Sequence, residues 1–272
     1  MKTIASKDNP VLKAARRLRG RKGREQEGAF LAEGRKLIAE ALSAGLSIDC
    51  LFVNAGALTH GGISEGDWAQ WPGWTTEPEV VALEEKLFYE LAQTKTPQPY
   101  IAVIRKSAIG NEQSSFPSEA RHALVLDRIG DPGNAGTMIR TAYAAGMEEV
   151  WCVKGTVDVF SDKVIRASAG AVFHIPVRES LSAEECIELA HSCGMKLIVC
   201  DVYGKNVYNI DMNGSVAIVV GSEGAGPQNA FLVAADAIAG IPMEEKSESL
   251  NAAIAAAIVM YEAKRRSIMD AE

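Results

Sequence analysis

The stretch "HALVLDRIGDPGNAGTMIRTAYAAG" (residues 122–146) decides the fold of the second half of the chain. Its apolar start, "HALVLD", predicts a buried strand, and a glycine-rich turn then leads into a helix-like run. Such turns usually hold phosphates or nucleotides at the start of the helix. The lysine of a P-loop is missing here, and Arg140 lies within the helical run instead. The turn therefore predicts an anionic ligand that is held differently from the phosphates of a P-loop protein.

Length and composition predict a globular protein of one or two domains. The chain has 272 residues, of which 47% are hydrophobic and 23% charged, enough for a sizeable core. Its longest apolar runs are too short to span a membrane, and its opening stretch "MKTIASKDNP" has no apolar signal core. The five cysteines form no CxxC pair, which favours reduced thiols. We therefore expect a cytoplasmic protein with no membrane partner.

Basic residues are concentrated at the start of the chain. The net charge is −7, but residues 1–24 hold nine basic side chains against one acid, Asp8. A basic arm on an acidic body can contact phosphates locally, which predicts a nucleic-acid partner. A solvated surface helix explains the same charge run equally well. The side chains predicted to contact phosphates are Arg16, Arg17, Arg19, Arg21, Lys22 and Arg24.

A polar stretch broken by Gly and Pro, residues 107–121, is typical of a linker. It separates a predicted domain of residues 1–106 from one of residues 122–272. The first domain has an α/β pattern. Its predicted helices are residues 10–20 and 35–45, and its predicted strands are residues 29–34, 48–54 and 99–106.

Strands and helices alternate after the linker. Such alternation predicts a mostly parallel sheet covered on both faces, with ligands bound at the carboxyl ends of the strands. The predicted strands are residues 123–127, 149–153, 174–177, 196–202, 215–221 and 237–241. The predicted helices are residues 134–146, 162–168, 182–193, 227–234 and 249–266.

Two of the segments that follow strands carry unusual polar residues. In the first, Asn134 can cap the following helix, and Arg140 lies in the first turns, where the helix dipole disfavours a cation. An anionic partner such as a phosphate accounts for Arg140, and a capped helix with a snorkelling arginine is the alternative. The second segment, "IVVGSEGAGP" (residues 218–227), is a strand that runs into a glycine-rich loop with Glu223. Its GxxGxG spacing, late in the chain, argues against a dinucleotide fingerprint.

The third segment is "IPMEEKSESLNAAIAAAIVMYEAKRR" (residues 241–266), which ends in a long alanine-rich helix. Ser247 and Ser249 are both plausible N-caps of this helix. Asn251 would then lie in the first turn, where its amide can face a ligand. A capped helix without any ligand explains Ser249 as well.

The three segments, in this order, resemble the three motifs of the SpoU (TrmH-type) family of RNA 2′-O-methyltransferases, which belong to the SPOUT class. The stretch "SDKVIRASAGAVFHIPV" (residues 161–177) is also similar to that family, and "REQEGAFLAEG" (residues 24–34) resembles the signature of its RNA-binding domain. The resemblance thus covers nearly the whole chain. It implies an α/β fold with a deep trefoil knot in the C-terminal domain. It also implies a smaller N-terminal α/β domain similar to ribosomal protein L30e.

The resemblance also implies a cofactor, S-adenosylmethionine (AdoMet), and a set of site residues. The family's cofactor-binding positions match Gly221, Ile241 and Leu250. Its catalytic polar positions match Arg140, Asn134, Glu223, Ser249 and Asn251. Because a guanidinium hardly deprotonates at neutral pH, we expect Arg140 to clamp the substrate phosphate and ribose rather than act as a base. No HExxH motif or Cys/His spacing indicates a metal site.

Family members pair through their knotted domains, so the resemblance implies a homodimer. Structured RNA, and ribosomal RNA of the 23S type first of all, is the expected substrate. A tRNA 2′-O-methyltransferase, a non-catalytic RNA-binding protein with a decayed methyltransferase domain and an antibiotic-resistance methyltransferase are the alternatives. Two positions depart from the family, since Glu245 replaces a usual glycine and Ala253 a usual serine. AdoMet affinity is the property that these departures affect.

Overall fold

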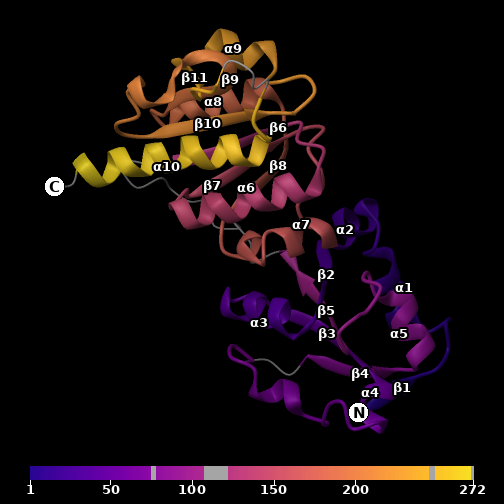
Figure 1. Cartoon of the computed structure of the whole chain (residues 1–272). Helices are drawn as coiled ribbons and strands as arrows, with labels where there is room; N and C mark the ends of the chain where they lie inside the picture. The colour runs from indigo at the N-terminus through magenta and orange to yellow at the C-terminus, as the bar shows by residue number, and fades with distance from the viewer. Residues whose placement is uncertain (75–77, 107–121, 245–248, 271–272) are drawn as a thin grey trace. The chain divides into compact units, whose positions relative to one another are not determined.

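The computed structural model describes residues 1–74, 78–106, 122–244 and 249–270. Contacts divide these residues into two compact units. The first contains residues 1–106 together with Phe160–Arg166, and the second contains the rest of the described chain from His122 onward. The predicted linker, residues 107–121, lies outside the described residues. Figure 1 shows both units with their helices and strands labelled.

The N-terminal unit is built on a five-stranded mixed sheet with the strand order β1-β4-β3-β5-β2. Strand β4 pairs in parallel with β1 and β3, whereas β5 pairs antiparallel with β3 and β2. The strands are β1 (Lys2–Ile4), β2 (Ala29–Glu33), β3 (Ile48–Asn54), β4 (Glu79–Leu83) and β5 (Tyr100–Arg105). The helices are α1 (Pro10–Arg17), α2 (Arg21–Glu27), α3 (Arg35–Ser43), α4 (Ala55–Thr59) and α5 (Glu85–Leu91), with a 3-10 turn at Asp67–Gln70.

The predicted elements of this unit are confirmed, but one predicted helix is shorter than expected. The helix expected over residues 10–20 ends at Arg17, and α2 begins at Arg21. Gly20 adopts an extended backbone between them, with φ −101° and ψ 148°, and this breaks the helical path. Strand β4 and helices α2, α4 and α5 were not predicted from the pattern.

The C-terminal unit is built on a six-stranded sheet with the strand order β11-β9-β10-β6-β7-β8, and every pair is parallel. This confirms the predicted parallel α/β architecture. The strands are β6 (His122–Asp127), β7 (Glu149–Val153), β8 (Val177–Leu181), β9 (Lys196–Asn206), β10 (Val216–Gly221) and β11 (Ala237–Gly240).

Helices cover both faces of this sheet. Helices α6 and α10 pack against each other on one face, whereas α8 and α9 pack together on the other (Figure 1). Alternate strand residues such as Val125 and Trp151 meet α8 and α9 in one apolar core. The helices that follow β6 in the chain are α6 (Pro132–Ala145), α7 (Asp162–Ala167), α8 (Ala183–Ser192), α9 (Asn229–Ala234) and α10 (Ala252–Asp270). Helix α7 belongs almost entirely to the N-terminal unit.

Three predicted boundaries are wrong for identifiable reasons. The strand expected at residues 174–177 begins only at Val177, because Pro176 has no N–H to donate to a ladder. The cap of α6 is Asp131, whose carboxylate accepts the Asn134 N–H at 2.7 Å, so Asn134 lies inside the helix. Helix α10 begins at Ala252 rather than near residue 249.

Candidate functional site

A cavity of about 520 Å³ lies at the carboxyl ends of β10 and β11, beside residues 200–202 in the middle of β9. This is the place where parallel α/β sheets bind ligands, and the volume suits a small organic molecule. The three residues predicted to bind a cofactor all line it, namely Gly221, Ile241 and Leu250. Glu223, Ser249 and Asn251 line it as well.

The loop after β10 forms one wall of the cavity. It turns back on itself, because the Gly226 N–H donates to the Ser222 carbonyl at 2.8 Å. At Gly221 an added Cβ would lie 2.2 Å from the Gly226 carbonyl carbon, so no side chain fits there. The sequence needs glycine at this position for the two limbs of the loop to approach each other closely. As a result, bare backbone faces the cavity.

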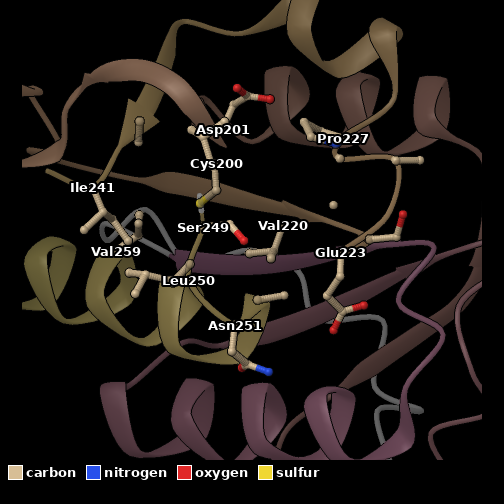
Figure 2. A pocket seen from close by; sticks show the side chains of 18 of the residues that line it. Cys200, Asp201, Val220, Glu223, Pro227, Ile241, Ser249, Leu250, Asn251 and Val259 are labelled. Carbon is tan, nitrogen blue, oxygen red and sulfur yellow. The ribbon is translucent and has the colours of Figure 1, made fainter. Parts of the chain in front are cut away.

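One end of the cavity is apolar. Figure 2 shows Ile241, Leu250 and Val259 gathered on one side of the hollow, while Glu223 lies at the other. Cys200 also lines the apolar part, and desolvation together with the charge of Asp201 raises the pKa of its thiol to about 12. This thiol therefore stays protonated and serves as part of an apolar wall rather than as a nucleophile.

The other end carries a chain of polar side chains from three distant segments. The Asn251 amide donates to the Asn134 amide oxygen at 3.0 Å. The Asn134 amide in turn donates to a carboxylate oxygen of Glu223. Three of the predicted catalytic residues are thus in contact, although they come from α6, the loop after β10 and the start of α10.

Two of these polar side chains lie at helix N-termini. Asn134 lies in the first turn of α6, and Asn251 caps α10 by accepting the Ala253 N–H at 2.9 Å and the Ile254 N–H at 3.3 Å. The predicted cap at Ser249 is therefore wrong, and Ser247 lies outside the described residues, as does Glu245. The positive end of the α6 dipole favours the Glu223 carboxylate, which accepts from Asn134 in the first turn of that helix.

Arg140 is not part of this cluster. It lies on the exposed side of α6, nearly two turns beyond Asn134, and does not line the cavity. Among the described residues it makes no hydrogen bond or ion pair. The structure therefore brings together seven of the eight predicted catalytic and cofactor-binding residues. Six of them line the cavity, and Asn134 contacts two of these six, Glu223 and Asn251. The eighth, Arg140, faces outward.

The basic residues at the start of the chain divide into two kinds. Arg17, Arg19, Arg21 and Lys22 are exposed on α1, α2 and the turn between them. Arg24, by contrast, is only 6% exposed and donates to the carbonyls of Leu18 at 2.7 Å and Arg19 at 2.9 Å.

This placement does not fit the prediction that Arg24 contacts phosphate, because its guanidinium is occupied by the protein backbone. Arg16 pairs with Glu90 at 2.6 Å, and the exposed Arg17 and Arg21 also pair with Glu27 at 3.5 Å and with Glu25 at 2.7 Å. The sequence showed the charges but not which of them the fold uses internally.

Asp127, at the end of β6, was missed by the sequence analysis. It is fully buried and accepts hydrogen bonds from the Gln228 N–H and the Gln228 side-chain amide, both at 2.7 Å. It also pairs with Arg128 at 3.0 Å. The sequence does hold a signal for Asp127, because a carboxylate at the end of an otherwise apolar strand must be hydrogen-bonded if it is buried.

Among the described residues, no group of three or more His, Cys, Asp or Glu side chains is placed to hold a metal ion. None of the helices in that part of the chain has the length and apolar character needed to cross a membrane.

The chain matches two protein-family models. Residues 121–261 match the SpoU rRNA Methylase family, and residues 9–102 match an MRM3-like substrate binding domain. The first match contains every predicted catalytic and cofactor-binding residue. The second contains every predicted phosphate-contacting residue.

Individual relatives agree with these matches. The chain is 34% identical to the 23S rRNA (guanosine(2553)-2′-O)-methyltransferase RlmP of Bacillus subtilis, over 96% of this chain and 98% of that protein. It is 29% identical to the 23S rRNA (uridine(2479)-2′-O)-methyltransferase of Streptomyces viridochromogenes, over 92% and 88% of the two chains.

Solved structures show the same likeness in three dimensions. The SpoU methyltransferase AviRb of S. viridochromogenes, in complex with AdoMet, has a TM-score of 0.82 at 28% identity and covers 95% of this chain and 98% of its own. An AdoMet-bound rRNA methyltransferase of Sinorhizobium meliloti has a TM-score of 0.78 at 30% identity and 97% coverage of each chain.

Proposed function

This chain belongs to the SpoU rRNA methylase family of RNA methyltransferases, and we propose that it methylates a ribose 2′-hydroxyl of 23S-type ribosomal RNA with AdoMet as donor. One observation carries the proposal. Three segments from different parts of the chain meet at one cavity, and Asn134 joins Glu223 to Asn251 at its polar end. Named relatives that methylate 23S rRNA at ribose support the choice of substrate.

The residues of the cavity fit AdoMet. The apolar side chains Ile241, Leu250 and Val259 suit a flat adenine ring, and the bare backbone around Gly221 offers hydrogen-bonding groups to its polar edge. The cavity volume of about 520 Å³ suits a ligand of this size. When bound, AdoMet supplies an electrophilic methyl group on a sulfonium sulfur.

The polar end then positions the substrate. We assign to Glu223 the role of accepting a hydrogen bond from the ribose 2′-hydroxyl, because it lines the cavity and its carboxylate is held by the Asn134 amide at the N-terminus of α6. Ser249 adds a hydroxyl that faces the same cavity. Holding the hydroxyl oxygen in line with the methyl group supplies much of the rate, and the proton leaves late or to water.

Arg140 fits this proposal only in a homodimer. Its guanidinium faces outward from α6, so it would reach the cavity of a second copy and clamp the RNA phosphate there. The same helix face carries the half-exposed Tyr143, and the neighbouring α10 carries the half-exposed Ile254 and Tyr261. Large apolar side chains exposed on two packed helices support pairing through this unit.

The finer features of the fold belong to the same proposal. We propose that the C-terminal unit contains a deep trefoil knot and that the N-terminal unit is an L30e-like RNA-binding domain. The position of residues 249–251, which line the cavity beside the carboxyl end of β10, supports the first feature. The exposed Arg17, Arg19, Arg21 and Lys22 support the second, and contact with ribosomal RNA implies a cytoplasmic location.

Methyl transfer from radiolabelled AdoMet to purified RNA tests the proposal. Full-length protein should label unmodified 23S-type ribosomal RNA, and mapping should place the label at one ribose 2′-oxygen. Labelling of tRNA alone would replace the proposed substrate with the tRNA alternative. RNA binding without AdoMet binding or methyl transfer would instead identify a non-catalytic RNA-binding protein.

A further inference from the structure

A buried carboxylate joins the central strand of the C-terminal sheet to the loop that walls the cavity. Asp127 is the last residue of β6, and it lies beside Gly221, the last residue of β10, in the parallel register. Its two oxygens accept the backbone and side-chain N–H groups of Gln228, both at 2.7 Å. The ascending limb of the loop is therefore held by the sheet and the descending limb by Asp127.

Arg128 adds a second tie to the same limb. Its guanidinium donates to Asp127 at 3.0 Å and to the Gly226 carbonyl at 3.1 Å. Gly226 lines the cavity, whereas Arg128 does not. Arg128 thus affects the cavity wall indirectly, through its hydrogen bond to the backbone of the loop.

The backbone of Arg128 has an unfavourable conformation. Its φ is +57°, in the left-handed region that residues with a Cβ rarely adopt. The side chain lies over Gly155, where an added Cβ would come within 3.2 Å of it. Such strain persists where surrounding contacts overdetermine it, and it is often found where a site is held in shape.

We propose that Arg128 is a positioning residue, which fixes the descending limb of the loop at residues 221–227 so that the cavity has its AdoMet-binding shape before the ligand arrives. The inference rests on the proposed function, in which this cavity takes AdoMet. A preformed wall lowers the ordering that binding requires, so loss of the guanidinium raises the dissociation constant for AdoMet. Arg128 does not contact Glu223, Asn134 or Asn251, so a variant without its guanidinium retains turnover at saturating AdoMet.

Two substitutions at Arg128 separate this role from a merely structural one. Arg128→Gly and Arg128→Ala both remove the guanidinium, but only glycine relieves the left-handed strain. Calorimetry with AdoMet should show binding weakened by roughly tenfold in both variants, on the scale of a lost charge-assisted hydrogen bond. The melting temperature without AdoMet should be higher for Arg128→Gly than for Arg128→Ala by roughly 2 °C or more. The kcat at saturating AdoMet and RNA should stay within about twofold of the wild type.

Ser180→Gly is the matched control. Ser180 is another residue in the left-handed region, with φ +64°; it is exposed and does not line the cavity. This variant should keep or gain stability and bind AdoMet as the wild type does. If Arg128→Gly binds AdoMet normally while Arg128→Ala does not, affinity follows stability and the inference is overturned. Wild-type protein that binds no AdoMet would overturn the proposed function, and this inference with it.

Discussion

At the scale of single residues, Asn134 connects the other polar residues of the proposed site, since its side-chain amide both donates to Glu223 and accepts from Asn251. Asn134→Ala removes both contacts and frees the carboxylate to reorient. We expect methyl transfer at saturating RNA to fall by roughly a hundredfold, on the scale of losing a key polar group from a site. AdoMet affinity should change little, because Asn134 does not line the cavity. Single-turnover transfer measures this.

The exposed Thr137, one turn further along α6, gives a matched control for that variant. Thr137→Ala should keep full activity. A loss of activity there equal to that of Asn134→Ala would show that the helix surface as a whole matters, rather than the amide.

Arg140 tests whether an outward-facing cation takes part in the reaction. Arg140→Ala should lower methyl transfer at saturating RNA by roughly a hundredfold or more, because the substrate phosphate and ribose lose their clamp. Calorimetry should show unchanged AdoMet affinity, since Arg140 does not line the cavity of its own chain and is proposed to hold RNA phosphate, not AdoMet, in that of the second copy. Unchanged turnover in this variant would leave Arg140 as an ordinary helix surface residue.

At the scale of elements, the start of α10 combines a helix cap with part of the site. Asn251→Ala should lose about 1 kcal/mol of stability, because the Ala253 and Ile254 N–H groups lose their acceptor. It should also lose activity, because the donor to Asn134 is gone. Asn251→Asp keeps the cap but not the donor, so thermal melting should be near that of the wild type while methyl transfer stays low. Recovery of activity in Asn251→Asp would reduce Asn251 to a structural cap.

Helices α1 and α2 carry the basic residues that are proposed to bind RNA. Replacing the exposed Arg17 and Lys22 by alanine should weaken RNA binding and reduce the slope of log affinity against log salt by about one for each lost phosphate contact. Filter binding at several salt concentrations measures this slope. Turnover at saturating RNA should survive.

Arg24→Ala provides the contrast to that pair. Its buried guanidinium holds two backbone carbonyls, so this variant should lose stability and keep the salt slope. A changed slope in Arg24→Ala together with an unchanged one in the double variant would reverse the assignment.

Patterns of apolar residues predicted most elements, and family motifs predicted most of the site. The strand at residues 149–153 and the strand and loop at residues 218–227 are found where the alternation placed them. Two helix starts were missed, because Asn134 was expected to cap the first helix and Ser247 or Ser249 the last, whereas only the packed structure selects Asp131 and Asn251. The tie between Asp127 and Gln228 was missed because it joins positions far apart in the chain, and no local pattern records such a contact.

At the scale of the whole molecule, the proposed role of Arg140 in the reaction requires a second copy of the chain. Sedimentation at micromolar concentration should give about twice the monomer mass of 29.1 kDa. A clean monomer at that concentration would contradict the proposed dimer.

Mixed dimers test whether the site is shared between the two copies. Co-expression of Arg140→Ala chains with Asn134→Ala chains produces some mixed dimers, which contain one chain of each kind. If each site combines Asn134 of one copy with Arg140 of the other, a mixed dimer has one site with both residues intact and one site with both replaced. Activity of the mixture should therefore exceed the sum of the two separate variants, and methyl transfer measures it. Activity no greater than that sum would place Arg140 and Asn134 in the site of the same copy.

The register of the C-terminal sheet has a consequence for how the chain is made. Strand β6 lies at the centre of the sheet, yet its partner β10 is synthesised long afterwards, as the pairing of His122 with Val216 shows. The N-terminal sheet, by contrast, is complete once residue 105 has been made. On the ribosome the first sheet can therefore form early, while the apolar strand β6 remains without its neighbour β10. Newly made chains should consequently depend on chaperones during synthesis of the second half, and folding should be limited by closure of that central strand pair.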